Sequence, residues 1–343
     1  MQGRLKLAAL FGLVAATLSG TWSLQARAGE PIKPKVLVIT MFGEEAKPWL
    51  AGKKLDTKVK VPGLSGEYPE VSCDSEGLCL MTTAMGFSNA ASSVAALVFG
   101  KQFDLGQTYF LIGGIAGVDP KDGTLGSALW ARYVVDGGLR HDIDPRQIPQ
   151  DWPDGMVALG AKRPGEKAGW GAGTEVYALS PALAEKAFGL TKSVELADGD
   201  DAAQYRSRYE EEAARGKPSV KLCDTVSLDT YWHGSKIGDA VERWTAQVSD
   251  GKANYCTTQM EDNATLTALK RGADAGLLDF SRIAVLRTAS NFDREAPGQT
   301  AIDSLGAKSG GFMPSVTNAY RVGSALTDTI IADWDVWSAG VPR

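Results

Sequence analysis

Residues 256–269 read CTTQMEDNATLTAL and place a carboxylate at the boundary between two kinds of regular structure. A polar run typical of a short strand comes first, and small and apolar residues at helical spacing follow Asp262. Glu261 is therefore expected where a strand gives way to a helix, a place that is rigidly held and exposed. A carboxylate there can hold a ligand by accepting hydrogen bonds, although capping the helix is an equal alternative.

Outward from this stretch, buried strands alternate with helices along most of the chain. Apolar runs predict strands within residues 35–42, 107–120, 128–137 and 282–294. The second of these strands is expected to end in a glycine-rich loop at residues 113–117. Helices are predicted at residues 88–100, at residues 239–249 and directly after Glu261. This alternation predicts an α/β domain with a mostly parallel central sheet.

The middle of the chain, residues 146–215, has weaker periodicity and is rich in proline, glycine and charge. Its polar stretch at residues 160–173, GAKRPGEKAGWGAG, predicts a surface loop.

Residues 1–28 have the layout of a secretory signal peptide. They combine a positive start at Arg4 and Lys6, a mostly apolar run at residues 7–18 and an A-x-A cleavage site ending at Ala28. We therefore expect a single mature domain at residues 29–343, secreted across the inner membrane to the periplasm. A membrane anchor is the weaker alternative, because the apolar run is short for a span.

The mature chain is acidic. The sequence has 36 Lys and Arg against 41 Asp and Glu, and three basic residues lie in the leader, which leaves 33 against 41, a net charge of −8. An acidic chain without a basic cluster is a poor candidate for binding nucleic acid or an anionic membrane surface. No apolar run after residue 28 is long enough to cross a bilayer, so we expect no integral membrane segment after cleavage.

Four cysteines follow the leader, and in an oxidising compartment an even number suggests disulfides. Two short strands around the turn at residues 74–77 would bring Cys73 and Cys79 together across a hairpin, so we favour this pair. Cys223 and Cys256 are then either bonded or free and buried. No metal site is expected, because the spacings are unlike those of zinc ligands and the chain has only 2 histidines.

The candidate ligand-binding residues are those just past the predicted strands, because ligands of open α/β sheets bind at the carboxyl ends of strands. They are Glu44 and Glu45, residues 113–117, residues 229–233, Glu261, and residues 291–293. Glu261 could accept hydrogen bonds from sugar hydroxyls, and Glu45 could supply a base that activates water. A solvated first turn of a helix is the plain alternative for Glu45.

Aromatic and amide side chains in the same set suit a planar ligand. Tyr231 and Trp232 could stack on a ring, although anchoring in the core is about as good an explanation. Asn291 and Asp293 could bond the edge of a base, with a plain turn as the alternative. The chain has no GxGxxG fingerprint, P-loop or Gly-x-Ser-x-Gly elbow, which disfavours dinucleotide, ATP and serine-hydrolase sites.

Six segments keep an order that is typical of one family. They are GEE after the first strand, MGFSNAASSVAALV, GGIAGVDP, CDTVSLDTYWHG, TTQMEDNATLTALKRG and LRTASNFDR. Together they resemble the purine nucleoside permease family, from about residue 33 to residue 339. More distantly the chain is similar to the nucleoside phosphorylase superfamily, including the methylthioadenosine nucleosidases. The resemblance implies a nucleoside phosphorylase-like fold, a central mixed sheet flanked by helices, and a purine nucleoside as ligand.

The resemblance also implies roles for individual residues. Met260 and Glu261 match a Met-Glu pair whose carboxylate holds ribose hydroxyls, and Glu45 matches the glutamate that orients the attacking water. The remaining substrate-binding positions are Gly114, Ile115, Ala116 and Gly117 beside the ribose, Tyr231, Trp232 and His233 in the loop that borders the base, and Ser290 in the Ser-Asn-Phe-Asp corner.

Two departures from the superfamily bear on the chemistry. Asn291 stands where the nucleosidases have an Asp that protonates the purine, and Asp293 is a candidate substitute acid. In phosphorylases of 6-oxopurines an Asn in an equivalent role contacts the base, so the resemblance implies altered base preference as readily as lost activity. Ile112 stands where many phosphorylases carry a phosphate-binding Arg. The sequence therefore does not favour phosphorolysis over hydrolysis. Inorganic phosphate would be a co-substrate only for phosphorolysis, and no other cofactor is expected.

The sequence leaves different functions open. One is cleavage of the N-glycosidic bond of a purine nucleoside, with Glu45, Asn291 and Asp293 as the catalytic groups. Another is a non-catalytic periplasmic nucleoside-binding protein that contributes to uptake, which the permease label and Asn291 favour. A pocket that has drifted to another ligand is a third. Superfamily relatives are commonly dimers, trimers or hexamers, so the resemblance also implies a homo-oligomer.

Overall fold

A mixed sheet of twelve strands organises the part of the chain that the structure describes. The computed structural model describes residues 30–342, and the predicted signal peptide of residues 1–28 lies outside them. The main path of the sheet is β10 (Val176–Ala178), β7 (Tyr133–Asp136), β12 (Thr225–Ser227), β13 (Thr257–Gln259), β5 (Tyr109–Val118), β1 (Val36–Thr40), β4 (Leu78–Thr82), β3 (Glu70–Cys73) and β2 (Thr57–Lys60). Off this path lie β6 (Ala128–Trp130), β11 (Val220–Leu222) and β14 (Ile283–Phe292), and a separate two-stranded sheet contains β8 (Arg140–Asp142) and β9 (Met156–Ala158).

The sheet combines parallel and antiparallel strand pairs. β1 pairs in parallel with both β4 and β5, and β14 pairs in parallel with β5. β13 runs antiparallel to β5, and β2, β3 and β4 form an antiparallel edge. The sheet is therefore mixed, as the family resemblance implies. The expectation of a mostly parallel sheet is confirmed by a narrow margin, because six of its eleven strand pairs are parallel and five are antiparallel.

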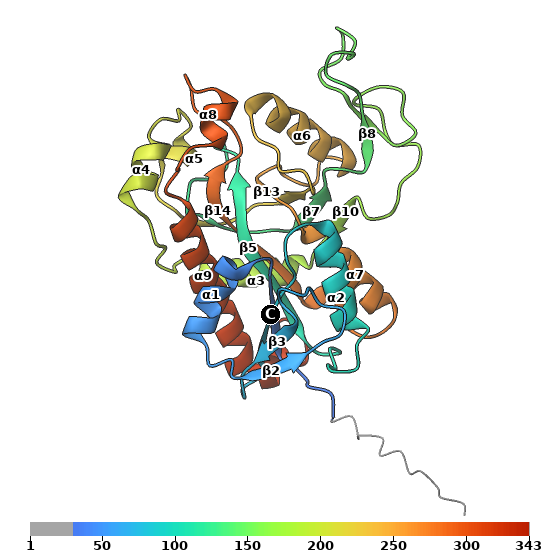
Figure 1. The fold of residues 1–343 in the computed structure, drawn as a ribbon, viewed down its shortest axis with the longest axis vertical. Coiled ribbons are helices and arrows are strands. Elements are labelled where there is room, and N and C mark those ends of the chain that lie inside the picture. The colour runs from blue at the N-terminus through green and yellow to red at the C-terminus, as the bar shows by residue number, and fades with distance from the viewer. Residues whose placement is uncertain (1–29, 343) are drawn as a thin grey trace, which may run out of the picture. The chain divides into compact units, whose positions relative to one another are not determined.

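Helices cover both faces of this sheet (Figure 1). The longer ones are α1 (Gly43–Gly52), α2 (Phe87–Val98), α3 (Pro181–Thr191), α6 (Ser235–Val248), α7 (Asp262–Asp274) and α9 (Phe312–Ala332). The short ones are α4 (Asp200–Arg206), α5 (Glu212–Arg215), η1 (Phe280–Arg282), α8 (Ala301–Leu305) and α10 (Trp334–Trp337). Within residues 30–342, no helix is both long and apolar enough to cross a bilayer.

The two faces of the sheet have separate hydrophobic cores, because side chains alternate along a strand. On β1, Leu37 and Ile39 belong to the core that includes α2 and α7. Val36 and Val38 belong to the core that includes α1, α3 and α9. Figure 1 shows α1 and α9 on one side of the sheet and α2 and α7 on the other.

Several elements differ from those predicted. Residues 128–137 form two strands, β6 and β7, because the carboxylate of Asp224 accepts the backbone N–H groups of Arg132 and Tyr133 at 2.9 Å each, where the chain changes strand partners. Residues 113–117 continue β5 instead of forming a loop, because β14 pairs with them. The helices α3 and α9 have no counterpart among the predicted elements, whereas residues 160–173 form the mostly exposed loop that the sequence predicts.

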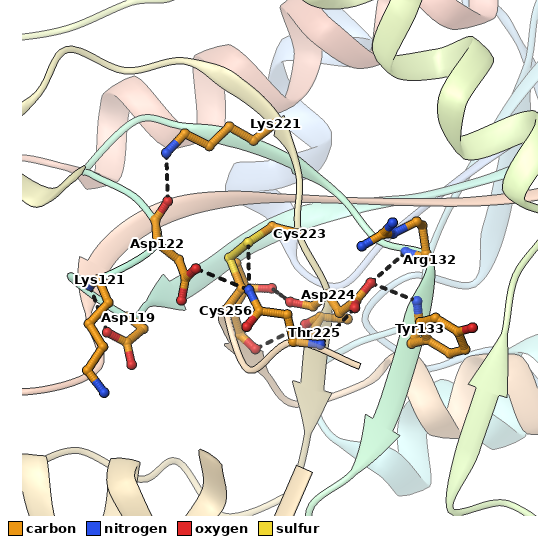
Figure 2. Close-up of a disulfide and its surroundings, with 12 residues drawn as sticks. Asp119, Lys121, Asp122, Arg132, Tyr133, Lys221, Cys223, Asp224, Thr225 and Cys256 are labelled. Atoms are coloured by element: carbon orange, nitrogen blue, oxygen red, sulfur yellow. Dashed lines mark hydrogen bonds between the residues drawn. A yellow bond between two sulfur atoms is a disulfide. The ribbon is translucent and has the colours of Figure 1, made fainter. Parts of the chain in front are cut away.

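All four cysteines are disulfide-bonded. Cys73 and Cys79 face each other across the β3–β4 hairpin, which confirms the predicted pair. Cys223 follows β11 and is bonded to Cys256, the residue before β13 (Figure 2). Asp224, the neighbour of Cys223, anchors β7 through its backbone bonds (Figure 2). The second bridge therefore fixes the segment that leads into Glu261.

Removal of the two bridges should have unequal effects on stability. A disulfide restricts the unfolded chain more when the loop it closes is longer, and the two loops span separations of 33 and 6 residues. We expect the double variant Cys223→Ala/Cys256→Ala to lose about 3–4 kcal/mol in the free energy of unfolding and Cys73→Ala/Cys79→Ala about 2 kcal/mol. Urea denaturation of both variants measures the difference, and an equal or reversed loss contradicts this ranking.

Candidate functional site

A cavity opens at the end of the sheet where the candidate residues gather. Its volume is about 690 Å³, open mouth included. Its wall consists of Met41, Phe42 and Glu45 at the β1–α1 junction, Met85 before α2, Ile115, Ala116 and Gly117 on β5, Tyr231 and Trp232 after β12, Thr258, Gln259, Met260 and Glu261 at the β13–α7 junction, and Arg287, Ser290 and Asn291 on β14.

Glu45 points into this cavity from the first turn of α1 and is 3% exposed. Its two carboxylate oxygens accept the backbone N–H groups of Met41 at 2.7 Å and Ile115 at 2.8 Å. Burial raises the pKa of Glu45 to about 7, although Arg287 and the two backbone donors favour the charged form. The solvated helical residue is its neighbour Glu44, which is exposed.

Glu261 occupies the N-cap position of α7, but its side chain makes no capping hydrogen bond. The capping side chain is that of Gln259, whose oxygen accepts the backbone N–H groups of Glu261 at 2.8 Å and Asp262 at 2.9 Å. The Glu261 carboxylate lies in the cavity wall and accepts the N–H of Gly86 at 3.2 Å. Burial raises the pKa of this carboxyl, and Arg287 opposes the shift. Its place in the wall leaves the carboxylate available to a ligand.

A buried arginine, Arg287, connects these acidic groups. It is 1% exposed and forms an ion pair with Asp262, in which its Nε lies 3.0 Å from a carboxylate oxygen. Its guanidinium also donates to the backbone oxygen of Ile115 at 2.9 Å and lies 3.4 Å from Glu261. Burial alone would lower the pKa of Arg287, but the surrounding carboxylates raise it, so the group stays charged.

Uncharged polar and aromatic groups form another part of the wall. Asn291 donates a hydrogen bond to the hydroxyl of Tyr231 at 2.8 Å, and Ser290 donates to the Asn291 side-chain oxygen at 2.8 Å. Tyr231 is half-exposed, whereas Trp232 is buried and donates to the hydroxyl of Tyr255 at 3.1 Å. A planar ligand could therefore contact rings here and carboxylates elsewhere in the same cavity.

Among the residues given individual roles from the sequence, Gly114, His233 and Asp293 are not part of the cavity wall. A Cβ atom at Gly114 would lie 2.5 Å from a Glu45 carboxylate oxygen, so this glycine lets the Glu45 carboxylate approach β5 closely. The Asp293 carboxylate is buried and bonded to Arg294 at 2.9 Å and Tyr255 at 2.5 Å, which removes it from the cavity as a substitute acid. His233 lies beyond Trp232, outside the wall.

Comparison with known families gives a clear match. The model of the purine nucleoside permease (NUP) family matches residues 33–342. The chain belongs to this family. A probable purine nucleoside permease of Schizosaccharomyces pombe is 38% identical over 353 residues, covering 95% of this chain and 99% of the relative. A purine nucleoside permease of Candida albicans is 37% identical over 320 residues, covering 91% of this chain and 79% of the relative.

Solved structures share the fold of this permease-family chain. Futalosine hydrolase of Helicobacter pylori superposes with a TM-score of 0.52 at 15% identity, covering 86% of this chain and 98% of that one. The 5'-methylthioadenosine/S-adenosylhomocysteine nucleosidase of the same organism gives a TM-score of 0.53 at 14% identity, covering 86% and 99%. At this identity the likeness shows the α/β fold with its mixed central sheet.

Several residues in or beside the cavity wall of this permease-family chain are not predicted from the sequence. The sequence does contain an indication for Arg287, because an arginine within a predicted buried strand needs a buried partner of opposite charge. Gln259 and Asp262 adjoin the predicted Glu261, but their roles as cap and ion-pair partner depend on the pairing of β13 with β12 and β5 and on the position of Arg287 on β14. Met41, Phe42 and Met85 lie in the wall without any sequence pattern that separates them from core residues.

The titration of Glu45 should make stability depend on pH. Because its pKa is about 7 in the folded chain and near 4.5 when exposed, the folded state keeps a proton that the unfolded chain has already released between these values. The resulting stabilisation is complete below about pH 4.5 and is lost as the pH rises through 7, a change of about 3 kcal/mol. Asp119, whose pKa burial also raises to about 7, acts in the same direction.

We therefore expect Glu45→Gln to flatten the fall in the free energy of unfolding between about pH 5 and pH 8, measured by urea denaturation at each pH. The matched control is Glu44→Gln, which removes an exposed carboxylate one residue away and should keep the parent slope. A Glu45→Gln protein with the same slope as the parent would show that Glu45 is ionised at all these pH values.

Proposed function

We propose that this chain is an exported protein that binds purine nucleosides and hydrolyses their N-glycosidic bond, releasing the purine base. One observation carries the proposal: Glu45 and Glu261 share a single cavity with Tyr231 and Trp232, so groups suited to a water, a sugar and a base meet in one place. Family membership supports a nucleoside ligand, and the fold shared with nucleosidases supports bond cleavage. Two disulfides support an oxidising compartment, the periplasm in a bacterial cell.

The sugar would be held by Glu261. A carboxylate with two oxygens can accept hydrogen bonds from two neighbouring hydroxyls, and charged acceptors form the stronger hydrogen bonds. Gly86 and Arg287 fix the position of this carboxylate from behind. Met260 and Ile115 supply apolar contacts beside it in the wall.

The water would be held by Glu45. As the N-glycosidic bond breaks, the ribosyl group passes through an oxocarbenium-like state, and a nearby carboxylate stabilises the developing positive charge. A general base works best when its pKa is near the operating pH, and the pKa of Glu45 is about 7. Glu45 would therefore orient the water and take its proton as the oxygen adds to the sugar carbon.

The charges of the wall favour water over phosphate as the attacking group. Arg287 is the one basic side chain in the described wall, and Asp262, Glu261 and the backbone oxygen of Ile115 already occupy its guanidinium. Ile112, at the position where many phosphorylases carry an arginine, is buried and apolar. A phosphate anion would thus meet carboxylates without a free cation, which opposes its binding.

A nucleoside-binding protein without catalysis is the second candidate. The names of the Candida albicans and Schizosaccharomyces pombe relatives favour it, as does Asn291 in place of an acidic residue. This candidate needs the same cavity but gives Glu45 no chemical task.

Purified protein incubated with inosine, adenosine and guanosine separates these functions. We expect free purine to appear in the absence of phosphate, and we expect added phosphate to leave the rate unchanged. Chromatography of the products measures the release. Release that requires phosphate would contradict hydrolysis. Binding by calorimetry with no release would favour the transport-related candidate.

Two variants test the assigned roles. Glu45→Gln should lower kcat about 10²- to 10³-fold and leave nucleoside affinity within a few fold, because it removes the base that takes the proton from water. Glu261→Ala should abolish measurable nucleoside binding, since the ribose loses its acceptor. Glu44→Gln is the control for both. Parent-like affinity in Glu261→Ala, with an unchanged unfolding midpoint, would show that Glu261 does not hold the sugar.

A further inference from the structure

The amide of Asn291 has no hydrogen-bond donor left for a ligand. A side-chain amide has two N–H groups and one oxygen. One N–H is donated to the Tyr231 hydroxyl at 2.8 Å and the other to the backbone oxygen of Phe292 at 2.9 Å, while the oxygen accepts from Ser290 at 2.8 Å. Asn291 therefore cannot stand in directly for an acid that donates to a purine, unless these bonds break.

The Tyr231 hydroxyl, unlike the Asn291 amide, still has a hydrogen-bond donor for a ligand. It accepts the hydrogen bond from Asn291, and among residues 30–342 no acceptor takes its own proton. The side chain lines the cavity and is 53% exposed, so the O–H can turn toward a bound ligand. Burial of the phenol raises the pKa of Tyr231 above its ordinary value of 10, so the hydroxyl keeps its proton at neutral pH.

The loop that carries Tyr231 is anchored on both sides. Before it, Asp229 accepts the backbone N–H of Phe87 at 2.6 Å, at the start of α2. After it, the backbone N–H of Gly234 donates to the backbone oxygen of Asp293 at 2.9 Å. Asn291 itself projects from β14 beside a β-bulge that lies between Ala289 and Asn291. The phenol is thus held from several directions although its ring is half-exposed.

Buried groups beneath the loop extend this support. Trp232 donates to the Tyr255 hydroxyl at 3.1 Å, which in turn donates to the Asp293 carboxylate at 2.5 Å. Asp293 therefore supports the loop from below and does not face the ligand. This arrangement fixes the neighbour of Tyr231 in the core and leaves the phenol at the surface of the cavity.

We infer that Tyr231 donates the hydrogen bond that stabilises the departing purine, and that Asn291 is a positioning residue that orients the Tyr231 hydroxyl. The inference rests on the proposed function. It assigns the stabilisation of the leaving purine to Tyr231, because neither Asn291 nor Asp293 has a free hydrogen-bond donor for this step. In this inference the groups that face the purine are a neutral phenol and a neutral amide, in place of an acidic side chain.

The reaction balances without another reagent. When the bond between the sugar carbon and the purine nitrogen breaks, its electron pair stays on the purine, and the O–H of Tyr231 stabilises that charge through a ring nitrogen. Water adds to the sugar carbon and gives one proton to Glu45, which returns it to solvent. The purine anion takes a proton from solvent, so nucleoside and water yield sugar and neutral purine.

The leaving group provides the test. In 7-methylguanosine the base is already positively charged and leaves as a neutral molecule, so it needs little help from a donor. We expect Tyr231→Phe to lower kcat/KM for guanosine about 10²- to 10³-fold and for 7-methylguanosine less than about threefold. The ring is retained in this variant, so stacking is unchanged. Tyr320→Phe, a change on α9 away from the cavity, is the matched control and should keep both rates.

Equal losses on both substrates, or no loss on guanosine, would overturn the inference, because either result means that the hydroxyl does not act on the leaving group. Asn291→Asp gives a second test. A carboxylate accepts the Tyr231 proton instead of donating to its oxygen, so we expect guanosine cleavage to fall while 7-methylguanosine cleavage persists. A faster Asn291→Asp enzyme would show that residue 291 acts on the base directly.

The parent protein separates this inference from the proposed function. If the unmodified chain cleaves neither guanosine nor 7-methylguanosine, the proposed hydrolysis fails and Tyr231 has no leaving group to assist. If it cleaves both and Tyr231→Phe responds equally on each, hydrolysis stands and the role of Tyr231 is refuted.

Discussion

The cavity depends on the buried guanidinium of Arg287, whose charge is balanced by carboxylates of the same chain. Arg287 lies within a strand that is almost entirely buried, where an unpaired charge would cost several kcal/mol. Its bonds to Asp262 and to the backbone oxygen of Ile115 join β14 to the start of α7 and to β5, although Ile115 and Arg287 are 172 residues apart in sequence. The position of Glu261 follows from this junction, since it directly precedes Asp262, the ion-pair partner of Arg287.

The same junction divides the cavity by charge. One cation is shared by Asp262 and Glu261 and acts on Glu45 from a distance, so acidic groups outnumber basic ones where a sugar and a water would bind. In the part of the wall formed by Tyr231, Ser290 and Asn291 the polar side chains are uncharged. A neutral ligand that develops positive charge on its sugar and negative charge on its base fits this division, because each developing charge meets groups that stabilise it.

The sequence was informative where chemistry and element boundaries coincide. Glu45 and Glu261 could be picked out because each follows a strand, and the resemblance attached them to one family. It failed where one residue's role depends on a distant partner. Asp293 looked equivalent to Asn291 by spacing, but Tyr255 and Arg294 bury it outside the cavity wall. The glycines at 113–117 suggested a loop, yet pairing with β14 extends them into a strand. Sheet order and ion pairing of this kind are set by tertiary contacts that no local pattern records.

The strand β2 forms one open edge of the sheet. Its sequence TKVK sets Lys58 and Lys60 along that edge, and every residue of the strand is at least partly exposed. Adding a foreign strand there would bring these ammonium groups against an incoming backbone, which is a common defence against edge-to-edge aggregation. The lysines of β2 therefore protect this edge of the sheet from pairing with a second chain.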